Sequence, residues 1–206
     1  MRGAVDLEEQ IEMFYACWFE FPNPPATTNL TQHHGPLPDL ISAAEHGLFL
    51  RTDTSDSESA GEWCKDPQSG PSAATLFKKL RWVSLGPHYN WTLRTYDLAS
   101  QHRSLPESLV SLWRRFASMI ARIEGTSMDD WKPDVALVNY YSEGDTLGGH
   151  KDDVENDLNK PIVCISLGQP GIFLMGGETK DVHPTPILLR SGDVIVMSRQ
   201  ARRCFH

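Results

Sequence analysis

Two histidines and one aspartate in this sequence form a pattern that could bind a redox-active metal. His150 and Asp152 make an H-x-D pair, and a distant His206 is the last residue of the printed chain. Two neutral imidazoles and one carboxylate on one face of Fe(II) leave positions open for a co-substrate and dioxygen, which is typical of non-haem oxygenases. On an extended strand, side chains two residues apart project to the same side, so His150 and Asp152 can converge on one ion. An isolated H-x-D pair also arises by chance, so the surrounding elements decide its meaning.

Short runs of β-forming residues flank the pair. Residues 135–141, 161–168 and 191–197 are rich in β-branched side chains and bounded by Gly, Pro or Asp. This pattern predicts short antiparallel strands that close into a barrel. The turn residues Ser191-Gly192-Asp193 indicate a hairpin, which would supply the return path that brings His206 to the other two ligands.

Two helices are expected around these strands. Apolar residues at near-helical spacing predict an amphipathic helix over 6–21, ended by Pro22, that serves as a packing arm. Ser104 and Glu107 make a capping signal ahead of a second helix. One face of that helix carries Leu109, Leu112, Trp113, Phe116, Ile120 and Ile123. We expect this face to brace the outside of the barrel.

Length and composition indicate one domain with a real core, since the chain has 206 residues and 40% hydrophobic content. Residues 51–74 are dominated by Ser, Asp, Glu, Gly and Pro, which predicts a disordered acidic and Ser-rich loop. We therefore expect an N-terminal helix and wrapping arm at 1–50, the loop at 51–74, and a compact domain at 75–206 that carries the H-x-D pair and His206.

Targeting signals and cysteine usage favour an intracellular protein. No apolar run is long enough to predict a membrane span, and the N-terminus lacks the apolar segment of a secretory signal. The four cysteines lack C-x-x-C spacing, which favours free thiols in a reducing compartment over a disulfide pair. We expect the nucleus or cytoplasm, with the mitochondrion as a further option.

The formal net charge of -8 disfavours a strongly basic nucleic-acid binder. Much of the acidity, however, lies in residues 51–74, where it need not face a substrate. Basic residues gather elsewhere, and Arg202 and Arg203 lie beside the third candidate ligand. The charge therefore lowers the expectation of a nucleic-acid partner without excluding it.

From Leu80 to His206 the chain resembles the AlkB family of Fe(II)/2-oxoglutarate dioxygenases, and within it the homologue 1 subfamily. The matching segments follow the family's order and cover roughly the last three fifths of the chain. They are Leu80–Gly86, His88–Trp91, Asn139–Tyr141, His150–Asp152, Ser166–Gln169, Phe173–Gly177, Ser191–Asp193 and Arg202–His206.

The resemblance implies an α+β fold, a double-stranded β-helix or jelly-roll barrel braced by helices. It implies Fe(II) at His150, Asp152 and His206, with 2-oxoglutarate as co-substrate and dioxygen as oxidant. Asn139 and Tyr141 are the contacts it suggests for 2-oxoglutarate. The implied activity is oxidative demethylation of N-methylated bases, methyladenine above all, in DNA or tRNA by a monomeric enzyme.

Substrate contacts follow from the need to take a base out of the stack and hold it against aromatic surfaces. His88, Tyr89 and Trp91 lie in the segment that resembles the family's nucleotide-facing lid, and Arg202 is a candidate beside the metal. Nothing in the sequence decides between DNA and RNA.

One departure from the family pattern concerns an arginine that follows the third ligand and holds the distal carboxylate of 2-oxoglutarate, and a second arginine that lies near it. The sequence stops at His206, so we expect it to lack the last barrel strands and both arginines. We expect a truncated chain rather than a degenerate protein, and weak metal and 2-oxoglutarate binding by the chain as printed. Two other functions stay open: a protein-side-chain oxygenase of the same fold and a catalytically impaired nucleic-acid-binding form.

Overall fold

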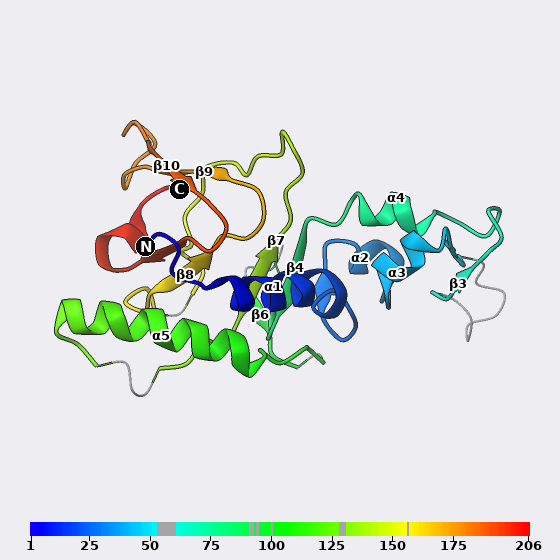
Figure 1. Ribbon diagram of the computed structural model, residues 1–206, viewed down its shortest axis with the longest axis horizontal. Helices are drawn as coiled ribbons and strands as arrows, with labels where there is room; N and C mark the ends of the chain where they lie inside the picture. Colours follow the sequence, from blue (N-terminus) through cyan, green and yellow to red (C-terminus); the bar gives the residue numbers. More distant parts are fainter. Residues whose placement is uncertain (53–60, 91–92, 94, 100, 128–130, 156) are drawn as a thin grey trace. The chain divides into compact units, whose positions relative to one another are not determined.

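The chain forms two compact units, each assembled from segments that are far apart in the sequence (Figure 1). The first unit contains Met1–Phe14, Pro106–Pro133 and Thr146–His206, and the second contains Tyr15–Leu105 and Asp134–Asp145. A computed structural model describes residues 1–52, 61–90, 93, 95–99, 101–127, 131–155 and 157–206. No helix in this described part of the chain is long and apolar enough to cross a membrane.

The strands of the first unit form two antiparallel pairs. Strand β8 (Ile162–Ile165) pairs with β11 (Val194–Met197), so that Ile162 lies opposite Met197. Strand β9 (Gly171–Met175) pairs with β10 (Thr185–Leu189). Helix α5 (Glu107–Glu124) packs on β8 and β11, as expected for the bracing helix.

Helix α5 ends at a glycine, as helices commonly do, but its N-terminal end lacks the side-chain cap that we predicted. Its last residue is followed by Gly125 in the left-handed conformation at φ 67°, which is the common glycine end of a helix. The first turn begins after Pro106, and no side chain caps it. The predicted cap from Ser104 is therefore wrong, because Pro106 with its extended backbone takes the capping position.

The first residues of the chain are tied to the turn before β11. The Met1 amino group donates to the Val194 carbonyl at 2.6 Å, and the Gly3 amide donates to the Asp193 carboxylate at 2.7 Å. Helix α1 (Leu7–Tyr15) follows and continues into a π-helix over Ala16–Glu20. The helix predicted over 6–21 is present, but Leu7, Ile11 and Phe14 on its apolar face are exposed and Met13 is the one buried residue of α1, so its packing role stays a prediction.

The second unit contains a three-stranded antiparallel sheet. Its strands lie in the order β1 (Thr27–Thr28), β4 (Trp82–Leu85) and β7 (Ala136–Asn139). Two further pairs are β2 (Phe49–Leu50) with β3 (Trp63–Cys64), and β5 (His88–Asn90) with β6 (Thr95–Asp97). The short helices are α2 (Thr31–His34), α3 (Leu40–Glu45) and α4 (Ala73–Phe77). Buried residues of its core include Phe21, Leu40, Leu50, Leu76, Val83 and Leu85.

The segment 51–74 is more ordered than its composition predicts. Residues 53–60 lie outside the described residues. In the remainder, β3 pairs with β2, and the Leu50 amide donates to the Pro71 carbonyl at 2.9 Å. Ser72 caps α4 by accepting from the Thr75 amide. The prediction of disorder was wrong for 61–74. Main-chain hydrogen bonds to β2 and its neighbours order this segment, and such bonds cannot be inferred from its low content of apolar side chains.

The predicted strands were largely right, but their connections were not. Strand β10 was missed, and it pairs with β9, whereas β11 pairs with β8. Ser191-Gly192-Asp193 therefore joins strands of two different sheets and is not a hairpin turn. The expected boundary at residue 75 is also absent from the two units, since residues on both sides of it belong to the second unit.

Candidate metal centre

The main chains of His150 and His206 lie side by side. The His150 amide donates to the His206 carbonyl at 3.0 Å, and the His206 amide donates to the His150 carbonyl at 2.9 Å. This mutual exchange is that of a hydrogen-bonded pair in an antiparallel ladder, which places both side chains on one face. The two imidazole centroids are consequently 4.5 Å apart.

Asp152 completes the cluster. Its carboxylate oxygens lie 3.7 Å from His150 Nε2 and 3.5 Å from His206 Nε2, and one ligand atom from each residue lies within 4.8 Å of the others. Two ligands at right angles, each about 2.1 Å from a first-row ion, are about 3.0 Å apart. Small side-chain movements would bring the three residues to that spacing. His150 and Asp152 lie in an irregular segment and not on the extended strand that we expected for residues 150–152.

Main-chain carbonyls orient both imidazoles. His150 Nδ1 lies 3.0 Å from the Gly148 carbonyl, and His206 Nδ1 lies 3.5 Å from the Cys204 carbonyl. A ring that donates from Nδ1 carries its lone pair on Nε2, which is the nitrogen that faces Asp152 in both cases. No sequence signal identifies these carbonyls, because every residue type carries one.

The segment that ends in His206 packs closely on the end of β9. The Gly176 amide donates to the Phe205 carbonyl, and the Phe205 amide donates to the Gly177 carbonyl, both at 2.8 Å. A side chain at Gly176 would place its Cβ 3.1 Å from the Phe205 carbonyl oxygen, so glycine permits the approach. Beyond it, the His206 ring stacks on Phe173 with centroids 5.6 Å apart.

The charges of the cluster suit a metal-binding carboxylate. Burial acts to raise the pKa of Asp152, but the hydrogen bond and charge of His206, with the charges of His150 and Arg202, lower it on balance. The hydrogen bond from Asp152 raises the pKa of His206, against the effect of burial. Burial also raises the pKa of the nearby Cys164 thiol to about 12, which keeps it protonated and disfavours it as a ligand.

Asn139, Tyr140 and Tyr141 alternate at the end of β7, in the second unit. Tyr140 is buried, its hydroxyl donates to the Cys17 carbonyl, and its ring packs on Trp18 at 4.8 Å. Tyr140 therefore has a packing role within the second unit. Asn139 and Tyr141 are exposed, as successive strand residues point to opposite sides. Their contact with 2-oxoglutarate stays a prediction.

The candidate base-stacking residues are also in the second unit. Trp91 lies outside the described residues. Tyr89 is buried and packs edge-on against Tyr96, which favours a packing role over the exposed stacking surface that we expected. His88 stacks on Trp82 with centroids 5.4 Å apart, and its ring nitrogens are buried without a hydrogen-bond partner among the described residues. Burial lowers the pKa of His88, so its ring carries no charge to attract phosphate at neutral pH.

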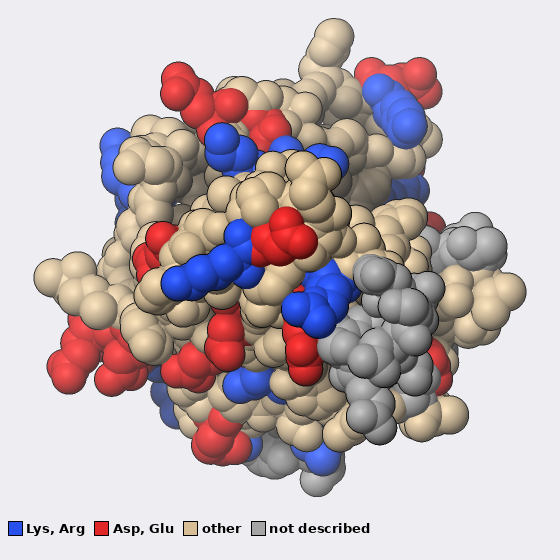
Figure 2. All heavy atoms as spheres, turned by 90° about the vertical axis from the view of Figure 1, so that its right-hand side faces the viewer, with Lys and Arg blue, Asp and Glu red and all other residues tan. Residues whose placement is uncertain are grey.

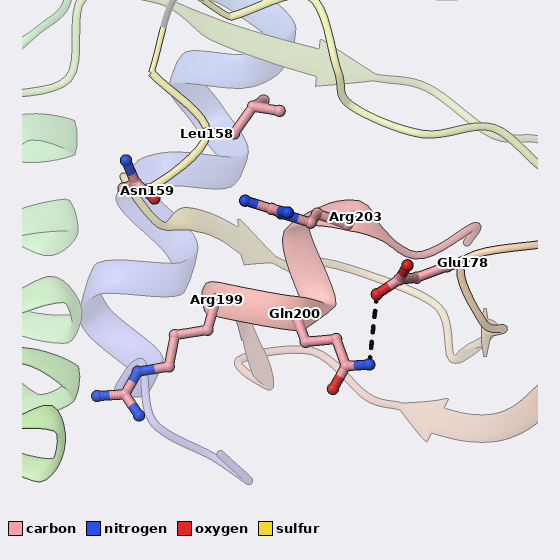
Figure 3. A pocket seen from close by; sticks show the side chains of 6 residues that line it. All are labelled: Leu158, Asn159, Glu178, Arg199, Gln200 and Arg203. Atoms are coloured by element: carbon pink, nitrogen blue, oxygen red, sulfur yellow. Dashed lines mark hydrogen bonds between the residues drawn. The ribbon is translucent and has the colours of Figure 1, made fainter.

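Arg202 differs most from the expectation. We predicted a substrate contact, but the side chain is only 1% exposed and is surrounded by acceptors from its own chain. Its neighbours Arg199 and Arg203 instead line a pocket of about 340 Å³ beside the 3-10 helix Arg199–Arg203 (Figure 3). In that pocket Gln200 donates to Glu178 at 3.4 Å.

Comparison with known proteins places this site in a family. Residues 35–206 match the family model of the 2OG-Fe(II) oxygenase superfamily. The chain belongs to this superfamily. Its description names the Fe(II) that the His150, Asp152 and His206 donor set fits, together with 2-oxoglutarate.

Individual relatives confirm the resemblance to the homologue 1 subfamily. The chain is 39% identical to the DNA N(6)-methyladenine demethylase ALKBH1A of Arabidopsis thaliana, over 98% of this chain and 60% of the relative. It is 31% identical to the tRNA demethylase abh1 of Schizosaccharomyces pombe, over 100% of this chain and 65% of the relative. The solved structure of OsALKBH1 is similar at 27% identity and a TM-score of 0.50, over 60% of this chain and 63% of that one. The chain thus spans less than two thirds of each relative.

Proposed function

We propose that this chain is the Fe(II)/2-oxoglutarate-binding part of a dioxygenase that removes methyl groups from nitrogen atoms of bases in DNA or tRNA. The observation that carries the proposal is the convergence of His150, Asp152 and His206 within 4.8 Å, with both Nε2 atoms turned toward the carboxylate. Three protein ligands leave positions for a co-substrate and dioxygen. Membership of the superfamily supports the same chemistry.

The residues of the chain have distinct roles in this proposal. His150, Asp152 and His206 hold the metal, while Asn139 and Tyr141 bind 2-oxoglutarate. Bound iron, 2-oxoglutarate and dioxygen together supply the oxidation, with succinate and carbon dioxide as the co-products. Hydroxylation of a methyl carbon on a base nitrogen gives a hemiaminal, which loses formaldehyde and leaves the unmethylated base.

Two relatives support a nucleic-acid substrate by name, one a DNA N(6)-methyladenine demethylase and the other a tRNA demethylase. The net charge of -8 and the interspersed acidic and basic side chains on the face in Figure 2 do not suggest a broad phosphate-binding surface. We infer that recognition depends mainly on an unstacked base held near the metal. We further propose that the antiparallel strands belong to a double-stranded β-helix.

Formaldehyde release tests the proposal. The substrates are single-stranded DNA with N-methylated adenine, methylated tRNA and a methyl-lysine peptide, each with Fe(II), 2-oxoglutarate and dioxygen. The proteins are the 206-residue chain and the product of the full open reading frame of its transcript. Asp152→Ala removes a ligand, and Asp153→Ala, at an exposed neighbouring acid, is the matched control.

We expect formaldehyde from methylated nucleic acid, lost in Asp152→Ala and kept in Asp153→Ala. Release from the peptide alone would assign the site to protein side chains instead. Metal binding without release from any substrate, by either protein, would favour a binding module and contradict the proposal.

A further inference from the structure

Arg202 makes three hydrogen bonds to one irregular segment of the chain. Its Nη1 donates to the Asp152 carbonyl at 2.6 Å, its Nη2 to the Glu155 carboxylate at 2.9 Å, and its Nε to the Lys160 carbonyl at 3.0 Å. The acceptors span the start, the middle and the end of residues 152–160. All three nitrogens of the guanidinium are therefore bonded to this segment.

Burial shows that this arrangement is specific to one of the arginines of the 3-10 helix. The Arg202 side chain is 1% exposed, whereas that of Arg199 is 65% exposed and Arg203 is also exposed. A buried guanidinium is tolerated only where its charge and donors are matched. Glu155 matches the charge, and the two carbonyls accept the other bonds.

The segment has little regular structure of its own to hold it. Its described residues form no helix or strand, and the hydrogen bonds within it join near neighbours around Asp157. Asp152 lies at the start of this segment, and Arg202 lies four residues before His206 in the chain. The Arg202 contacts thus connect the main chain of one metal ligand to the helix that leads to another.

We propose that Arg202 is a positioning residue that sets the Asp152 carboxylate against His206, which deepens the function proposed above and rests on its metal centre. The rigid guanidinium of Arg202 holds the Asp152 carbonyl at one end of the segment and the Lys160 carbonyl at the other. Lysine would not replace it, because an ammonium on a flexible stem lacks the planar fork that reaches three separate acceptors. Arg202 acts through Asp152 and contacts neither metal nor substrate.

Cobalt(II) binding by the full 206-residue chain tests this role. Arg202→Ala is compared with Arg203→Ala, which removes an exposed arginine from the same helix. Loss of a residue that supports a metal ligand typically weakens metal binding about 10- to 100-fold, and we expect such a loss in calorimetry for Arg202→Ala alone. The visible spectrum of bound cobalt should change as well, and added methylguanidinium should restore affinity and spectrum by filling the buried site.

A second readout needs no metal. Tryptic cleavage after Lys151 should be faster in Arg202→Ala than in Arg203→Ala, since the released segment becomes accessible. Glu155→Gln, which weakens one of the three contacts, should shift cobalt affinity and cleavage in the same direction by less, and it keeps the test available if Arg202→Ala does not fold.

The results separate this inference from the function it rests on. Unchanged cobalt affinity and unchanged cleavage in Arg202→Ala, or in Glu155→Gln where only that variant folds, would overturn the role of Arg202. So would equal losses in Arg203→Ala. Failure of the unaltered chain to bind cobalt would overturn the metal centre itself.

Discussion

Neighbouring tyrosines at the end of β7 should respond oppositely to loss of their hydroxyl groups. Tyr140 is 7% exposed and donates a hydrogen bond to the Cys17 carbonyl, whereas Tyr141 is 57% exposed. Tyr140→Phe should therefore reduce stability without affecting 2-oxoglutarate. Tyr141→Phe should weaken 2-oxoglutarate binding with little effect on stability.

The sizes of both effects follow from the contacts. Removing the Tyr140 hydroxyl leaves the partly buried Cys17 carbonyl without this partner, which costs about 1–3 kcal/mol of the free energy of unfolding. At a cost near the middle of that range, the melting temperature of a chain of this length falls by about 4–8 °C. A hydroxyl that donates to a carboxylate contributes about 1.5–3 kcal/mol, so Tyr141→Phe should raise the 2-oxoglutarate Kd about 10- to 150-fold.

Thermal melting of the metal-free chain measures the first effect, and calorimetry with 2-oxoglutarate and cobalt(II) in the absence of oxygen measures the second. Each variant is the control for the other, since both lose one oxygen atom from adjacent residues. A lower melting temperature for Tyr141→Phe together with weaker 2-oxoglutarate binding for Tyr140→Phe would refute the assignment of the two faces.

Three further outcomes test the metal site and the backbone. Asp152→Asn should abolish stoichiometric Fe(II) binding while Asp153→Asn retains it, and equal calorimetric titrations would remove Asp152 from the ligand set. Because Asp152 raises the pKa of His206, that imidazole is protonated below and somewhat above its ordinary pKa of about 6.5, and metal must displace the proton. Cobalt affinity should thus rise by up to about tenfold per pH unit through this range and level off only above it; a flat profile from pH 5.5 to 7.5 would contradict this. Gly86→Ala should cost about 3 kcal/mol or more in urea unfolding, since φ is +82° and the new Cβ would overlap a main-chain carbonyl oxygen, against about 1 kcal/mol for Gly125→Ala at φ +67° in open space. Equal costs would show that the close approach at Gly86 is absent.

The features that could be predicted from the sequence depend on local backbone geometry and on the chemistry of single residue types. The opposite sides taken by Tyr140 and its neighbours follow from the alternation of side chains along any strand. The helix over Glu107–Glu124 follows from its apolar spacing and from Gly125 after its end. The candidate metal ligands could be chosen because only a few residue types bind Fe(II), and the neighbouring motifs resembled one family.

Other features depend on segments that meet only in the folded chain. The paired backbones of His150 and His206, the pairing of β11 with β8, and the order of residues 61–74 all arise from main-chain hydrogen bonds between distant positions. Such bonds use groups that every residue carries, so residue identity does not reveal them.

Arg202 shows the same division for a single side chain. Its identity and its place beside His206 determined that a positive charge would lie near the metal site. Whether that charge meets a substrate or a partner within the chain depended on which groups the fold brought around it. The tertiary structure decided the matter by burying Arg202 against the carbonyls of Asp152 and Lys160 and the carboxylate of Glu155, because a guanidinium removed from water is stable only where such acceptors are already in place.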